Sequence, residues 1–244
     1  MLGSYGAGAF NKSAAEIVAF HADSRRILTV SAHSGKIDVL DASDAATPTK
    51  VGEASGGENT TINSVAVRRD GLAVATVEPE NKTDNGELIF FDASADELGA
   101  VLGRVALGAL PDMVTITPDD AYALVANEGE PAEDYSYDPE GSVSVVKLPT
   151  DVAAAPQDDV QTADFHAFEG TLAEKGVHIF GQVGDSKTEA QNLEPEYIAV
   201  SGGKAYVTLQ ENNAIAVVDI AAATVEDVWP LGYTDRREVP MDYS

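Results

Sequence analysis

The chain contains one short pattern four times, and this repetition constrains its fold more than any other feature. Each copy begins with a segment that has apolar residues at alternate positions, namely AEIVAF, INSVAV, PDMVTI and PEYIAV. A turn signal and a second β-rich run follow, and a third run ends at Asp41, Asp92, Lys147 or Asp219. Alternation with a period of two and many β-branched residues are typical of strands. The sequence therefore predicts four copies of one small sheet.

Short sheets of this kind form the blades of a propeller. The ends of the third runs lie 51, 55 and 72 residues apart, and a blade has roughly 40 to 50 residues. We predict an all-β fold, a β-propeller of four-stranded antiparallel blades with four recognisable blades, either closed or incomplete. The alternative is a β-sandwich with chance similarity between its strands. The predicted single domain, 1–244, has repeat units at about 15–54, 62–108, 111–149 and 195–232 and an insertion at about 150–192, with one helical turn at 172–175.

The charge of the chain excludes some classes of function. The sequence has 15 Lys and Arg against 41 Asp and Glu, so its formal charge is −26. Nucleic-acid binding needs clustered cations, so we expect no nucleic-acid partner. A hydrophobic fraction of 44% is too high for a disordered acidic chain. No run approaches the roughly 20 apolar residues that span a bilayer, and the absence of cysteine excludes disulfides and thiolate chemistry.

Two longer stretches resemble a known family. Residues 111–147 and 195–219 are similar to the YVTN-type β-propeller repeat. NEGEPAEDYSYDPEGSVSVV (127–146) and NLEPEYIAVSGGKAYVTLQENNAIAVVDI (192–220) resemble the bacterial choice-of-anchor I family. The opening LGSYGAGAFNKSAAEIVAF also resembles the mature start of that family. The resemblance covers the chain up to about Gly232.

The resemblance implies an exported protein with further blades, in the periplasm, at the cell surface or secreted, although this chain shows no signal segment. It carries no settled chemistry, since members bear phosphatase-like or nuclease-like labels. The final YTDRREVPMDYS offers no alternating strand to close a ring. Either four blades close on themselves, or an open sheet edge is left, and such an edge favours self-association.

The loop after the second strand of the third unit is the candidate metal site. Its carboxylates include Glu128, Glu130, Asp134, Asp138 and Glu140. Hard cations such as Ca²⁺ take six to eight oxygen ligands, and a loop with Gly and Pro can wrap around them. A solvated acidic surface loop is the alternative. The corresponding loop of the second unit, EPENKTDNGE, repeats the Glu-x-Glu entry, and neither loop has EF-hand spacing.

Equivalent positions at the ends of the second strands predict an acidic rim around one mouth of the propeller. These positions are His33, Glu78, Glu128 and Glu211. Glu194 and Glu196, which flank Pro195 at the start of the fourth unit, add to the same face, as does Asp112 in the third. Such a rim concentrates negative potential and attracts cations. The alternative is that a polar residue simply ends each buried strand.

Two functions follow from these features. The first is a non-enzymatic binding or interaction scaffold, stabilised by Ca²⁺, whose partner is a protein, a glycan or a small anion held through a bound cation. The second is a metal-dependent phosphoesterase, in which the loop carboxylates hold the metal. The absence of Lys and Arg between Arg104 and Lys147 favours the scaffold. We expect no nucleotide cofactor, because the chain lacks a phosphate-binding loop, and no catalytic residue can be assigned.

Overall fold

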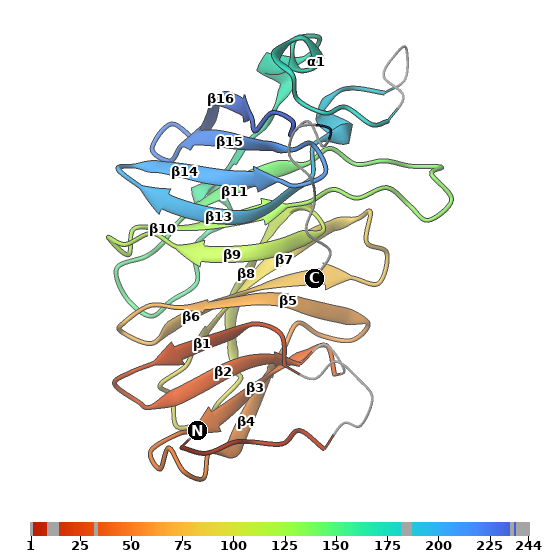
Figure 1. Ribbon diagram of the computed structural model, residues 1–244. Helices are drawn as coiled ribbons and strands as arrows, with labels where there is room; N and C mark the ends of the chain where they lie inside the picture. Colours follow the sequence, from red (N-terminus) through yellow and green to blue (C-terminus); the bar gives the residue numbers. More distant parts are fainter. Residues whose placement is uncertain (1, 9–14, 32–33, 182–186, 235–236, 238–244) are drawn as a thin grey trace.

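The strands form four separate sheets, each with four antiparallel strands in chain order. The computed structural model describes residues 2–8, 15–31, 34–181, 187–234 and 237. Figure 1 shows the sheets stacked in sequence order, from the first at one end to the fourth at the other. This arrangement confirms the predicted all-β fold with four-stranded antiparallel blades.

The strand bounds follow the repeat pattern. The first sheet contains β1 (Val18–His21), β2 (Arg26–Ser31), β3 (Lys36–Asp41) and β4 (Thr49–Ser55). The second contains β5 (Thr60–Val67), β6 (Leu72–Pro79), β7 (Asn85–Asp92) and β8 (Val101–Ala109). The third contains β9 (Pro111–Ile116), β10 (Tyr122–Asn127), β11 (Ser142–Lys147) and β12 (Val160–Ala163). The fourth contains β13 (Pro195–Ser201), β14 (Lys204–Leu209), β15 (Ala214–Asp219) and β16 (Thr224–Pro230). Each third strand ends at the residue that the sequence predicts.

The core consists of three apolar layers, one between each pair of neighbouring sheets. Successive side chains of a strand point to opposite faces, so a central strand serves two layers. In β10, Ala123 and Val125 pack toward the second sheet, whereas Leu124 and Ala126 pack toward the fourth. The second and third strands of the central sheets are therefore apolar on both faces. In the outer strand β16 only Val225 and Val228 are buried.

The two end sheets carry ion pairs on the faces that have no neighbouring sheet. Lys50 Nζ lies 2.8 Å from Asp38 in the first sheet, on the face opposite the buried Ile37 and Val39. In the fourth sheet, Lys204 Nζ lies 2.6 Å from Asp219. The four blades form a row, with the first and the fourth at its two ends (Figure 1).

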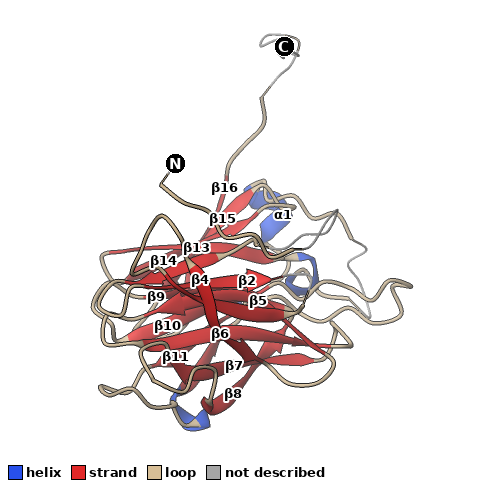
Figure 2. Ribbon diagram, turned by 90° about the horizontal axis from the view of Figure 1, so that it is seen from below, coloured by secondary structure: helices blue, strands red, loops and turns tan. Residues whose placement is uncertain are grey.

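The predicted insertion contains a strand of the third blade. β12 lies at 160–163, inside the segment 150–192, so the third blade extends beyond the predicted limit of 149. Two of the four side chains in β12 are exposed, because the strand lies at the outer edge of the sheet. Its sequence, VQTA, therefore has no run of apolar residues, and the sequence analysis did not predict this strand. The short helices are η1 (Gln157–Asp159), η2 (His166–Phe168), α1 (Leu172–Lys175) and η3 (Ala190–Asn192). They lie at the periphery of the strands (Figure 2), and α1 confirms the predicted turn. No helix of the described residues is long and apolar enough to cross a bilayer.

Candidate functional site

The antiparallel order of the strands divides the loops between two edges of the stack. The turns from first to second strand and from third to fourth strand lie at one edge. The turns from second to third strand lie at the opposite edge, which we call the 2–3 edge. The acidic loop (residues 128–141) belongs to the 2–3 edge, where it extends to the right of Figure 1.

Glu128 is the centre of a carboxylate cluster at the 2–3 edge. Its backbone N–H donates to the carbonyl of Leu110 over 2.8 Å, which fixes the residue directly after β10. Burial, the largest cause, and the negative charges of four neighbours together raise the pKa of Glu128 to about 8. These neighbours are Glu130, Asp112, Glu196 and Glu194. These residues come from two adjacent blades and the segment before β13, so the fold brings together acids that are up to 84 residues apart.

The other predicted rim residues lie at the same edge. Burial raises the pKa of Asp112, and the charges of Glu196 and Glu78 add to this. The amide of Asn63 donates to Glu78 over 3.0 Å. Glu211 follows β14, is exposed, and acts electrostatically on Glu194. His33 lies outside the described residues.

The loop carboxylates predicted to hold Ca²⁺ do not converge on one point. Glu130 Oε2 lies 2.5 Å from Lys82 Nζ, and Asp138 Oδ2 lies 3.2 Å from Lys187 Nζ. Asp134 is exposed and accepts the N–H of Ser136 in a local turn. Glu140 faces His166 instead, at 2.6 Å. Within the described ranges, no group of three or more His, Asp or Glu side chains is placed to hold a metal ion, so calcium binding at this loop stays a prediction.

The acidic loop is held by the β12–β13 connection (residues 164–194, of which 182–186 are not described). Thr188 donates to Glu140 over 3.2 Å, and the amide of Gln191 donates to the carbonyl of Asp138 over 2.6 Å. The carboxylate of Glu169 accepts the backbone N–H groups of Glu189 and Ala190, each over 2.9 Å. The extra residues of this unit therefore form a wall against the acidic loop.

A cavity of about 650 Å³ lies between the acidic loop and this connection. Its wall includes carboxylates, two lysines and two aromatic rings, and its main lining residues are Lys82, Glu130, Glu133, Tyr135, Asp138, Phe180, Lys187, Gln191, Asn192 and Glu194. Sequence reasoning missed the two lysines and Phe180 as site residues, because they come from segments outside the acidic loop and have no local motif.

Asn212 fixes the backbone of Glu194, the buried acidic residue that lines this cavity. Its side chain is fully buried, its Nδ2 donates to the carbonyls of Asn192 at 2.6 Å and His178 at 2.9 Å, and its Oδ1 accepts the N–H of Glu194 at 3.4 Å. Pro195 then restricts Glu194 to an extended backbone. Glu194 is 7% exposed. Burial raises its pKa to about 7, and Glu211 is the largest charge contribution to this shift.

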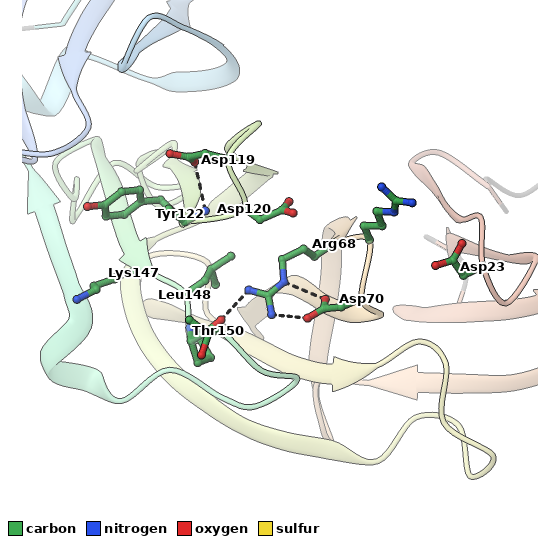
Figure 3. A pocket seen from close by; sticks show the side chains of 12 residues that line it. Asp23, Arg68, Asp70, Asp119, Asp120, Tyr122, Lys147, Leu148 and Thr150 are labelled. Atoms are coloured by element: carbon green, nitrogen blue, oxygen red, sulfur yellow. Dashed lines mark hydrogen bonds and ion pairs between the residues drawn. The ribbon is translucent and has the colours of Figure 1, made fainter.

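A second cavity, of about 710 Å³, lies at the opposite edge (Figure 3). Arg68, which is 5% exposed, dominates its floor. Its guanidinium donates to both carboxylate oxygens of Asp70, at 2.9 and 2.7 Å. It also donates to the carbonyls of Pro149 at 2.6 Å and Asp151 at 3.2 Å. Arg68 therefore joins the second blade to the third, which explains its burial by a structural role.

The comparisons with known proteins agree with this architecture. The family model of the choice-of-anchor I domain matches residues 16–244. No curated protein matches the chain. Among solved structures, the chain is similar to Kuenenia stuttgartiensis hydrazine synthase, with a TM-score of 0.57 and 14% identity over 93% of this chain and 52% of the other.

Two further structures share the fold. A protein from Lactobacillus plantarum has a TM-score of 0.59 and 14% identity over 88% of this chain and 57% of its own. A streptogramin B lyase has a TM-score of 0.56 and 11% identity over 91% of this chain and 56% of its own. The chain spans about half the length of the solved structures that it matches. At these identities the likeness concerns the fold alone.

Proposed function

Since the chain belongs to the choice-of-anchor I domain family, we propose that it acts as a non-catalytic binding module whose 2–3 edge takes cationic ligands. The stacked blades supply a rigid support, and the loops at one edge supply the binding surface.

The observation that supports this proposal is the carboxylate cluster around Glu128. Its members come from separate blades, and their negative charges act on one another across the blade boundary. Such a cluster costs free energy in the absence of a counter-charge, and it attracts cations over a distance of about one Debye length, roughly 8 Å at physiological salt. Binding a cation offsets the repulsion.

The hydrolase alternative has less support. Lys82 and Lys187 are the cations at the cavity, and carboxylates hold both of them. Neither ammonium group is therefore left to receive a phosphoryl group. We therefore propose the scaffold function, and Ca²⁺ is the inorganic cation that we propose as a ligand.

We also propose that the protein is exported, on the basis of its acidity, its lack of cysteine and its family. Fractionation of the native host should place the full-length gene product in the periplasm, the envelope or the medium. A purely cytosolic location would contradict this part of the proposal.

The binding function is tested with a decalysine peptide in fluorescence anisotropy at low salt and pH 9, where Glu128, whose pKa is about 8, is ionised and the peptide is still cationic. We expect the Asp112→Asn/Glu128→Gln variant to bind at least about tenfold more weakly than the wild type, because close charge pairs contribute one or more kcal/mol. The matched control is Asp23→Asn/Asp158→Asn, which removes two acids at the opposite edge. Equal loss in both variants would show non-specific attraction by net charge and would overturn the proposal.

A further inference from the structure

Two of the carboxylates that line the cavity at the 2–3 edge already hold an ammonium group. Glu130 pairs with Lys82, and Asp138 pairs with Lys187. A further lining acid, Glu194, is only 7% exposed, and its carboxylate makes no hydrogen bond or ion pair with any residue that the structure describes. A buried carboxylate without a counter-charge is costly. Glu194 is therefore the shielded carboxylate at which a bound cation would relieve this cost.

We propose that this cavity binds a small organic cation with one alkylammonium group, which pairs with Glu194 while its apolar stem lies against Phe180 and Tyr135. This inference rests on the proposed function, because it assigns a ligand class to the same edge.

The size and chemistry of the cavity favour an organic ammonium ion over a bare metal ion. A volume of about 650 Å³ falls in the range of small-molecule sites, roughly 300 to 1,000 Å³. Phe180 is 49% exposed and Tyr135 is 72% exposed, so both rings have area to cover an apolar stem. Aromatic faces also attract ammonium groups. The ammonium groups of Lys82 and Lys187 show that the carboxylates of this cavity accept this chemistry.

The charged surroundings of Glu194 give the interaction a defined pH dependence. The acids that act on it are Glu211, Glu130, Asp138 and Glu196, and the cations at the cavity are Lys82 and Lys187. Burial and these acids raise the pKa of Glu194 to about 7. Ammonium binding requires the ionised form, so affinity should rise as the pH increases from 6 to 8.

The test is isothermal titration calorimetry of the full chain with 2-phenylethylamine, and 2-phenylethanol is the neutral control of nearly the same shape. We expect the amine to bind and the alcohol to bind at least about tenfold more weakly, because a charge-assisted contact is lost. The affinity for the amine should fall by up to about tenfold from pH 8 to pH 6, since one group must ionise. Equal binding of amine and alcohol would overturn the proposal.

Three variants assign the contact. Glu194→Gln should weaken amine binding at least about tenfold and abolish its pH dependence between 6 and 8. Phe180→Ala changes an exposed side chain, so it should fold normally and still weaken binding several-fold. Glu80→Gln is the matched control, because Glu80 is an exposed acid at the 2–3 edge outside the cavity lining, and it should bind as the wild type does. Circular dichroism confirms that each variant is folded.

The outcomes separate this inference from the proposed function. If decalysine binds at the 2–3 edge but 2-phenylethylamine does not, the binding module stands and the cavity assignment falls. If Glu194→Gln is folded and binds the amine as tightly as the wild type, the assignment is also wrong. A last arm compares Nα-acetyl-lysine methylamide with its norleucine analogue. If the lysine derivative binds more tightly than both its norleucine analogue and 2-phenylethylamine, the ammonium group comes from a lysine side chain of a partner. If 2-phenylethylamine binds more tightly than the lysine derivative, the ligand is a free amine.

Discussion

The imidazole Nε2 of His166 lies 2.6 Å from a carboxylate oxygen of Glu140, and this contact joins the β12–β13 connection to the acidic loop. His166 belongs to the β12–β13 connection and Glu140 to the acidic loop. Glu140 therefore serves the packing of two segments at the position where the sequence predicts a metal ligand.

The contact with Glu140 should raise the pKa of the His166 imidazole. The hydrogen bond and the charge of Glu140 raise the pKa of His166 above its ordinary value of 6.5. The contribution of the pair to folding is therefore complete below pH 6.5, and it is lost as the pH rises through the higher pKa of the folded state. In Glu140→Gln, an NMR titration should show the pKa of His166 falling toward 6.5. An unchanged pKa would contradict the contact. Because His166 is mostly exposed, the change in melting temperature should be small.

Glu128 should make the protein less stable at alkaline pH. Its pKa rises from 4.5 to about 8 on folding, so the folded state holds a proton that the unfolded state releases between these values. The free energy of unfolding therefore falls as the pH increases from 4.5 to 8. Glu128→Gln should raise this free energy at pH 8 by about 1 to 3 kcal/mol, since one pKa unit corresponds to about 1.4 kcal/mol. It should have little effect at pH 4.5.

Urea denaturation at both pH values measures this difference. Glu133→Gln is the control, because Glu133 is an exposed acid of the same loop. If Glu128→Gln changes stability equally at pH 4.5 and pH 8, Glu128 does not titrate as we predict.

Arg68 should be the most sensitive basic residue between the second and third blades. Arg68→Ala leaves the carbonyls of Pro149 and Asp151 without their donor and should lower the free energy of unfolding by about 2 to 4 kcal/mol. Arg68→Lys should recover only part of this, because an ammonium group cannot donate in the planar two-pronged geometry. Arg69→Ala, at the exposed neighbouring position, should be close to neutral in the same urea titration. A similar loss of unfolding free energy in Arg68→Ala and Arg69→Ala would contradict the role of Arg68 in connecting the second blade to the third.

Gly141 should tolerate no side chain. A Cβ there would lie 1.9 Å from the carbonyl oxygen of Leu193 and 2.6 Å from Cδ of Pro195, so the acidic loop and the start of β13 would have to separate. Gly141→Ala should lower the melting temperature by several degrees and weaken amine binding, because Glu194 lies between these two contacts. Gly6→Ala, where a Cβ meets nothing within 4 Å, is the control. Normal melting and binding of Gly141→Ala would contradict the close approach.

Calcium should raise the melting temperature more than sodium does at equal ionic strength, if the acidic loop binds it. A ligand specific for the folded state adds about 2.7 kcal/mol at one hundred times its Kd. The Asp138→Asn/Glu140→Gln variant should lose this extra stabilisation by calcium. The variant also loses the contacts to Lys187 and His166, so its melting temperature with calcium is compared with its own melting temperature without calcium. Equal midpoints in calcium and matched sodium chloride would mean that screening alone acts.

Local patterning in the sequence was sufficient to predict the blades. The alternation of apolar residues, the turn residues and the third-strand ends at Asp41, Asp92, Lys147 and Asp219 are all properties of neighbouring residues, and a strand with a buried face shows them directly. The presence of acids at the ends of second strands also followed from the repeat, which placed Glu78, Glu128 and Glu211 at one edge.

The pairing of those acids depended on contacts between segments far apart in the chain. Lys82 reaches Glu130 across 48 residues, and Lys187 reaches Asp138 across 49. Asn212 positions Glu194 from 18 residues away. No local period encodes such contacts, because they depend on how one blade packs on the next and on where the β12–β13 connection lies. The sequence therefore predicted an acidic edge, whereas only the tertiary structure decided which carboxylate, Glu194, is buried there without a cation.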